Sequence, residues 1–192
     1  TGVQTCALPI SLTNAQFKAM TTDQFSNLST TQIRAISTGN MAVMETADLR
    51  ALNAAQITAL TSAQWNALSE TQIAALSTAQ VNSIETSALG LISPVLFKKL
   101  NTAQIGALST SQMEALTANQ VVEFTSAQFA SLTSSQLTAI ETRDVTSITT
   151  GALKGLTATK ITALTSAQVA ALSGEQVGSL SNAQIDGLST AQ

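Results

Sequence analysis

Residues 61–68 read TSAQWNAL, and this eight-residue pattern recurs in unbroken register from Thr13 to Gln192. Its consensus is Ser or Thr, any residue, a small residue, Gln, an apolar residue, any residue, an Ala-like residue and a Leu-like residue. Glutamine marks the register, because every glutamine except Gln4 falls on the same eight-residue lattice. The octad is therefore the structural unit of the chain, as in other tandem-repeat arrays.

Each octad carries a signal that starts a helix. A Ser or Thr hydroxyl at the first position can accept a hydrogen bond from an amide of the first turn, and Gln three residues later can bond back to the amide of the cap. Pro94 fits the same frame, because Ser93 becomes the cap and Pro94 the first helical residue. Glu45, Glu85 and Glu141 stand at the cap position of their octads. Since Glu is a poorer cap, we expect those octads to be looser.

The spacing of the two apolar positions decides between architectures. A continuous helix advances about 100° per residue, so an octad overshoots two turns by about 80° and its apolar positions would spiral around the rod. Coiled coils need a period of about 3.5 or 3.67 residues, and positions three apart point to opposite faces of a β-strand. We therefore predict an all-α solenoid, or superhelix, of short capped helices of about two turns, one per octad.

The apolar side chains of such a solenoid should line one shared interior. Trp65, Phe97 and Phe129 recur at the first apolar position. They could form a stacking platform for bases or sugars, but packing in the interior is the better interpretation. Some octads are irregular, and they suggest a longer period of six or seven octads that marks a bend or one circuit of the superhelix. In these octads Gln gives way to Asn40, Asp48, Ala88, Leu96, Asp144, Ala152 and Lys160.

The sequence divides into two segments. Residues 1–12 are an irregular leader, and residues 13–192 are the octad array, which stops in mid-octad at Gln192. We interpret the chain as a fragment truncated at its C-terminal end. The stretch TGVQTCALPIS (1–11) resembles adapter read-through at the edge of a gene assembled from environmental sequencing, and a genuine irregular linker is the alternative. The single cysteine, Cys6, lies in this leader and leaves the redox compartment open.

The array lacks the residue types of common catalytic and metal sites. The chain has no His and no Tyr, so the commonest general base and metal ligand are absent. Asp23, Asp48, Asp144, Glu175 and Asp186 do not cluster at the spacing of a calcium loop. We interpret them as solubilising residues. The sequence predicts no enzyme activity, no catalytic, cofactor-binding or metal-binding residues, and no cofactor.

Charge and hydropathy narrow the classes of partner. Only 10% of residues are charged, the formal net charge is −3, and no basic stripe could follow a phosphate backbone or an anionic membrane surface. No run reaches the roughly 18 consecutive apolar residues that would cross a bilayer. We therefore expect neither nucleic-acid binding nor membrane insertion. A protein or a glycan remains open as a partner.

One surface feature has functional potential, namely the hydroxyl row at the position directly after each cap. Such a row could bind ice or a polysaccharide, whereas the alternative is that Ser and Thr are merely tolerated in the first turn. Ala54, Glu70, Pro94, Ala118, Ala158 and Gly174 interrupt the row. Its members are Thr22, Thr30, Thr38, Thr46, Ser62, Thr78, Thr86, Thr102, Thr110, Ser126, Ser134, Thr142, Thr150 and Ser166.

The strings LTSAQ (60–64), LSTAQ (76–80) and IETRDV (140–145) resemble the short tandem repeats of very large bacterial secreted or cell-surface proteins, including adhesin-like ones. The resemblance covers residues 13–192 and implies no site residues. It implies a spacer or scaffold that holds other modules away from a cell, or a long interaction surface. The implied location is extracellular or at the cell surface.

Overall fold

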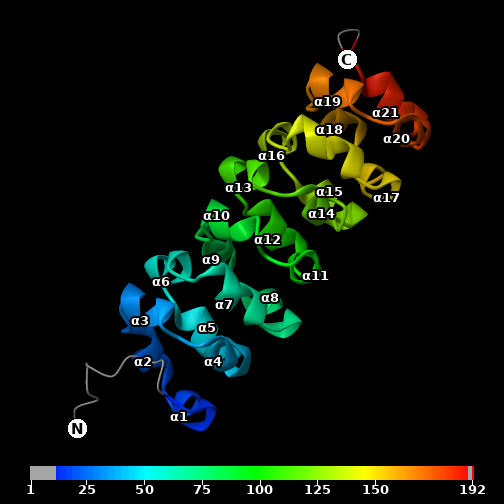
Figure 1. The fold of residues 1–192 in the computed structure, drawn as a ribbon. Helices are drawn as coiled ribbons and strands as arrows, with labels where there is room; N and C mark the ends of the chain where they lie inside the picture. Colours follow the sequence, from blue (N-terminus) through cyan, green and yellow to red (C-terminus); the bar gives the residue numbers. More distant parts are fainter. Residues whose placement is uncertain (1–11, 190–191) are drawn as a thin grey trace. The chain divides into compact units, whose positions relative to one another are not determined.

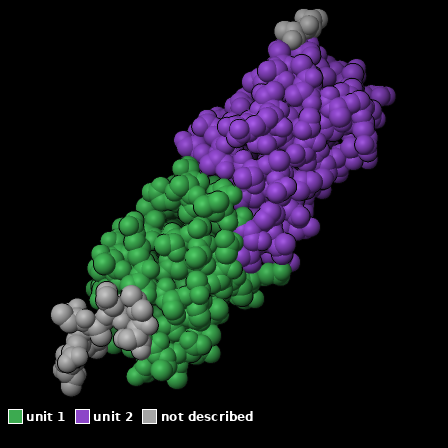
Figure 2. Space-filling view, viewed as in Figure 1, with its two compact units in different colours: residues 1–92 green, residues 93–192 purple. Residues whose placement is uncertain are grey.

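The computed structural model describes residues 12–189 and residue 192. The stretch 1–11, which carries the interpretation as adapter read-through, lies outside the described residues. The chain divides into two compact units, Thr1–Ile92 and Ser93–Gln192 (Figure 2). We describe each unit by itself.

Each octad forms one short helix between Thr13 and Leu188 (Figure 1). Unit 1 contains α1 (Asn14–Lys18), α2 (Thr22–Ser26), α3 (Thr30–Arg34), α4 (Thr38–Val43), α5 (Thr46–Ala51), α6 (Ala54–Thr58), α7 (Ser62–Ala67), α8 (Glu70–Ala75), α9 (Thr78–Asn82) and α10 (Thr86–Leu89). Unit 2 contains α11 (Pro94–Phe97), α12 (Thr102–Gly106), α13 (Thr110–Glu114), α14 (Ala118–Val121), α15 (Ser126–Ser131), α16 (Ser134–Thr138), the 3₁₀ helix η2 (Thr142–Ser147), α17 (Thr150–Leu153), α18 (Ala158–Ile161), α19 (Ser166–Ala170), α20 (Gly174–Gly178) and α21 (Asn182–Gly187).

The predicted fold class is confirmed, because each unit is an all-α solenoid of tandem short helices, and the described residues contain no strand. The regular part of each helix spans four to six residues. The rest of the octad forms the N-cap and the link to the next helix. Thr61, for example, caps α7 with an extended backbone at φ −81° and ψ 159°. The chain thus leaves each helix and restarts the next one within a single octad.

The capping box is also confirmed. The hydroxyl oxygen of Thr61 accepts a hydrogen bond from the amide of Gln64 at 3.3 Å, and Oε1 of Gln64 accepts from the amide of Thr61 at 2.9 Å. Asn53 takes the place of the hydroxyl residue in its octad and completes the same box with Gln56. These two bonds satisfy amides that an isolated helix end would leave without partners.

The octads with a different cap behave differently. Glu45, Glu85 and Glu141 are N-caps that make no side-chain cap hydrogen bond, and the octad of Glu141 forms the 3₁₀ helix η2 rather than an α-helix. Ser93 is the N-cap of α11 and Pro94 its first residue, as predicted, but the Ser93 hydroxyl makes no cap hydrogen bond. Its ψ of 133° turns the residue away from the geometry of the bonded caps.

Both apolar positions of the octad point into the unit that contains them. Trp65, Phe97 and Phe129 are at most 2% exposed, so the interpretation of these residues as interior packing is confirmed. In unit 2, the rings of Phe124 and Phe129 meet edge to face with their centroids 5.9 Å apart. Such aromatic pairs add to the stabilisation from burial. The burial is less complete in the last octads, where Val177 is 41% exposed.

Successive helices wind around this interior. In unit 1, α1 packs against α4, α2 against α5 and α4 against α7 (Figure 1). In unit 2, α12 packs against α15 and α18 against α21. Each contact joins octads that are three apart, so a circuit contains between three and four octads. Six or seven octads therefore make about two circuits, and the hypothesis that this longer period marks one circuit is wrong.

A second function of the octad glutamine, not predicted from the sequence, connects the circuits. Nε2 of Gln64 donates hydrogen bonds to the carbonyl oxygens of Ile33 at 2.7 Å and Ile36 at 2.8 Å, four octads earlier. We call this side chain, bonded to its own cap by Oε1 and to an earlier octad by Nε2, the glutamine bridge. Further glutamine bridges with two such carbonyl bonds and this register lie at Gln56, Gln72, Gln80, Gln136, Gln168, Gln176 and Gln184.

The glutamine bridge explains how a polar residue can be buried in every circuit. Gln64 is 2% exposed, and its amide group is bonded at both its oxygen and its nitrogen. A buried polar group is tolerated when its hydrogen-bonding capacity is satisfied. The bridge therefore couples octads that are neighbours in space but four octads apart in sequence. Contacts between neighbouring repeats have the same stabilising effect in other solenoids.

In the part of the chain that the structure describes, no helix has the length and apolar character needed to cross a bilayer.

Candidate functional site

The hydroxyl row lies on the surface. Its members are exposed or half-buried in both units. Because contacting helices belong to octads three apart, hydroxyls that are neighbours across circuits come from octads three or four apart rather than from consecutive octads. Some members are already bonded within the protein, as shown by Thr22, whose hydroxyl donates to Asp48 at 3.0 Å.

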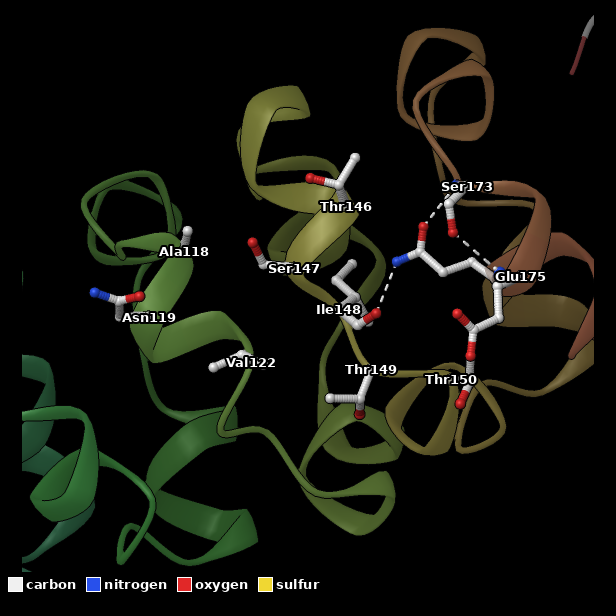
Figure 3. A pocket seen from close by; sticks show the side chains of 11 residues that line it. Ala118, Asn119, Val122, Thr146, Ser147, Ile148, Thr149, Thr150, Ser173 and Glu175 are labelled. Carbon is white, nitrogen blue, oxygen red and sulfur yellow. Dashed lines mark hydrogen bonds between the residues drawn. The ribbon is translucent and has the colours of Figure 1, made fainter.

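Unit 2 contains a groove that includes one member of this row (Figure 3). The junction of η2 with α17 forms its floor, from Thr146 to Thr150, and residues of α14 and α20 form its walls. The groove is open to solvent and has a volume of about 460 Å³. Its lining includes the exposed side chains of Asn119, Val122 and Glu175. This groove is hereafter called groove 1.

The hydrogen bonds around groove 1 show which of its polar groups are engaged. The Ser173 hydroxyl accepts from the amide of Gln176 at 3.2 Å, and the Thr149 hydroxyl accepts from the amide of Ala152 at 3.1 Å. Figure 3 also shows the bond that the side-chain Nε2 of Gln176 donates to the carbonyl oxygen of Ile148, at 2.7 Å. The first two bonds cap α20 and α17 within their own octads, and the third joins α20 to residues 141–148. The polar side chains of Asn119, Ser147, Thr150 and Glu175 also line the groove.

Unit 1 contains an equivalent groove of about 440 Å³, called groove 2. Its floor runs from Thr58 to Ser62, the same octad positions as Thr146 to Thr150 in groove 1. Arg34 and Leu91 lie on its walls, where Leu91 is 65% exposed. The repeat of this shape in both units shows that the groove arises where one circuit meets the next.

Neither groove assembles a set of groups suited to catalysis. Groove 1 has one carboxylate, Glu175, and groove 2 has Glu85 and Arg34 beside hydroxyls and apolar side chains. A nucleophile needs a base within hydrogen-bond reach. No hydrogen bond recorded for either lining joins a hydroxyl to a carboxylate. Among the described residues, no group of three or more His, Cys, Asp or Glu side chains is placed to hold a metal ion.

The bridge position, which is the fourth position of the octad, is where the sequence varies chemically. Two octads replace glutamine by another side chain with an N–H donor. Nδ2 of Asn40 donates to the carbonyl oxygen of Leu12 at 3.2 Å, and Nζ of Lys160 donates to the carbonyl oxygen of Ala130. In both, the donor still reaches a carbonyl of an earlier circuit.

Two other octads place an acid at the bridge position. Asp48 and Asp144 are each 6% exposed, so the interpretation of these two acids as solubilising residues is wrong. Asp48 accepts the hydrogen bond from Thr22. Burial raises the pKa of the Asp144 carboxyl above its ordinary value, Arg143 partly offsets this, and the charge of Glu141 adds to it. Nε of Arg143 lies 3.8 Å from Oδ2 of Asp144.

Sequence reasoning predicted no site residues, and it missed the carbonyl-binding function of the bridge position. A signal for it was present, because a capping box accepts Glu as well as Gln, yet no octad has Glu at this position. Glutamate would retain the cap acceptor and lose the N–H donor. The lack of Glu fits the use of the amide nitrogen in the octads that have Gln, while Asp48 and Asp144 show that an acid can occupy the position.

A protein-family model described as the ALTTAQ repeat matches residues 41–78, 97–126 and 137–174, which together make up more than half of the chain. The six letters correspond to the last two and first four positions of the octad, as in ALTSAQ at residues 59–64 and 163–168. No curated protein matches the chain.

Proposed function

Because the chain belongs to the ALTTAQ repeat family, we propose that it is a non-catalytic structural array, acting as a spacer or scaffold, or as an interaction surface, within a large bacterial surface or secreted protein. The observation that carries the proposal is the glutamine bridge. Each bridge binds carbonyls four octads earlier, so further octads can be added in register without a change of design.

The chemistry of the described surface supports a structural role. Grooves 1 and 2 are open and lack a convergent set of polar groups, whereas small-molecule sites are usually concave and largely enclosed. The contacts that stabilise the fold are repeated along the chain, since bridge and cap residues recur in octad after octad. A spacer needs this property, because its length must change without loss of structure.

The structural part of the proposal is tested by deleting one block of four octads, residues 101–132. The deletion keeps the register of the remaining bridges. We expect the shortened chain to fold with an unchanged helical circular-dichroism spectrum per residue, and the distance between two fluorescent labels flanking the block to fall. Global unfolding of the shortened chain would contradict a modular array. Deletion of residues 101–130, which breaks the octad register, is the matched control and should destabilise the fold.

The location is tested separately. Antibodies against the array should label intact cells that produce the full-length protein, and permeabilisation should not increase the signal. Labelling that requires permeabilisation would contradict a surface or secreted location while leaving the structural array intact.

A second candidate function is ice or glycan binding through the hydroxyl row. The observation in its favour is the exposure of the row and the position of Thr150 in groove 1. Thermal hysteresis and glycan-array binding of the purified chain test it, with Thr150→Ala as the variant of the groove. Absence of both activities would remove this candidate.

A further inference from the structure

The carbonyls that receive each bridge lie at fixed distances along the chain. Gln136 and Gln168 both donate to carbonyls 31 and 28 residues earlier. The same register places the bridge position of Asp144 against the carbonyls of Met113 and Leu116, at the C-terminal end of α13. Carbonyls at a helix C-terminus carry partial negative charge and need donors. An ionised carboxylate has none to offer.

Asp48 stands at the same octad position and shows what Asp144 lacks. The Thr22 hydroxyl, 26 residues earlier, donates to Oδ1 of Asp48 at 3.0 Å. The residue 26 positions before Asp144 is Ala118, which has no hydroxyl. Asp48 therefore receives a hydrogen-bond donor from the earlier circuit, whereas the equivalent position offers none to Asp144.

The charged groups near Asp144 are few. Arg143 contacts its carboxyl at 3.8 Å and also pairs with Glu141, at 2.5 Å. Of the helices that pack against η2, α14 and α19 carry no titratable side chain. Glu114 of α13 and Glu175 of α20, whose helices meet this octad through the bridge register, are exposed.

We propose that Asp144 is a pH-sensitive bridge that joins residues 141–148 to residues 109–116 only as a carboxylic acid. In the acid form, the carboxyl O–H donates to the carbonyl oxygen of Leu116, as Nε2 of glutamine does in other octads. On ionisation the proton leaves to solvent, and the carboxylate turns to Arg143. Residues 141–148 then lose the hydrogen bond to residues 109–116, while the bonds that Nε2 of Gln176 donates to Val145 and Ile148 remain.

The sign of the pH effect follows from the folded state favouring the neutral acid. The pKa of Asp144 is higher in the folded chain than in the unfolded chain. The stabilisation is therefore fully present below the pKa of the unfolded state, and it is lost as the pH rises through the folded pKa.

The experiment compares the full chain with Asp144→Gln, which supplies a permanent donor. We expect D144Q to melt about 2–4 °C higher than the parent at pH 7, and this difference to shrink towards zero as the pH falls to 4. In the parent, the ¹³C resonance of the Leu116 carbonyl should titrate together with the Asp144 carboxyl. Ala118→Thr should give Asp144 the hydroxyl that Asp48 has, and lower the midpoint of its titration.

Asp186→Asn is the control, because Asp186 is exposed. The difference in melting temperature between D186N and the parent should not shrink in the same way as the pH falls. A D144Q difference that is the same at pH 7 and pH 4 would overturn the proposal. The proposal would also be overturned if calcium chloride or sodium chloride removed the difference in melting temperature at pH 7, since a bound cation rather than a proton would then join the two octads.

Discussion

Nε2 of Gln64 lies 2.7 Å from the carbonyl oxygen of Ile33, 31 residues earlier in the chain. The same side chain accepts a hydrogen bond from the amide of its own cap, Thr61. One residue thus starts its own helix and satisfies the end of a helix in an earlier circuit. The local signal that breaks the chain into short helices is therefore also the contact that stacks them.

Replacing Gln64 by Glu separates these two functions. Glutamate can still accept from the Thr61 amide, but it offers no N–H to Ile33 and Ile36 and places a buried charge against their carbonyls. We expect a loss of about 2–4 kcal/mol in the free energy of unfolding at pH 7, measured by urea denaturation.

Gln24→Glu is the matched control for this change. Oε1 of Gln24 accepts from the Thr21 amide at 2.7 Å, and the described structure records no carbonyl bonded to its nitrogen. We expect a change of less than about 0.5 kcal/mol, because Glu is an accepted member of a capping box. Equal losses for the two variants would contradict a special function of the buried amide.

Close packing between octads three apart leaves no room for a side chain at Gly155. A Cβ added at Gly155 would lie 2.1 Å from the carbonyl oxygen of Ser126. We expect Gly155→Ala to lower the free energy of unfolding by about 1–3 kcal/mol, because the backbone of the earlier circuit must move. Gly178→Ala is its control, since no atom lies within 4 Å of the added Cβ, and alanine should be neutral or slightly stabilising in that helix. Thermal unfolding of both variants checks the contrast.

The cost in stability of a substitution at Trp65 should depend on how much buried side-chain volume is lost. Trp65 is fully buried, and among the described residues its Nε1 has no hydrogen-bond partner. We expect Trp65→Phe to cost less than about 1.5 kcal/mol, because the buried N–H is removed together with part of the ring. Trp65→Ala should cost about 3–5 kcal/mol through the cavity it leaves. A loss for Trp65→Phe as large as that for Trp65→Ala, measured by urea denaturation, would show that the indole N–H and not the ring volume determines the stability.

Groove 2 offers a site where a bridge can be restored. Ala88 lines this groove at a bridge position, and the carbonyls 31 and 28 residues earlier belong to Ile57 and Leu60. We expect Ala88→Gln to raise the free energy of unfolding by about 1 kcal/mol. Ala88→Glu supplies the same cap acceptor without the donor and should be destabilising. Stabilisation by both variants would indicate that filling the groove, and not the carbonyl bonds, is responsible.

Much of the architecture could be predicted from local chemistry. The Ser or Thr cap, Gln three residues later and the two apolar positions predict a capped helix per octad and a shared interior, and Thr61, Gln64 and Trp65 occupy those places. Local patterns do not determine the number of octads in a circuit, because this depends on how side chains from distant octads pack. The close approach of Gly155 to Ser126 is one such contact.

The bridge was missed for a related reason. A capping box explains why Gln64 follows Thr61 by three residues, and this explanation uses only the side-chain oxygen. The nitrogen binds a carbonyl that only the three-dimensional winding brings near. The surface grooves were also not predicted, since they form where circuits meet and not within an octad.

The most direct measurement is an NMR experiment on the ¹⁵N,¹³C-labelled chain that detects scalar couplings across hydrogen bonds. If the glutamine bridge holds the circuits together, Nε2 of Gln64 will show correlations to the carbonyl carbons of Ile33 and Ile36, and its side-chain amide protons will exchange slowly with solvent. Fast exchange at Gln64, with no correlation to either carbonyl, would contradict the account.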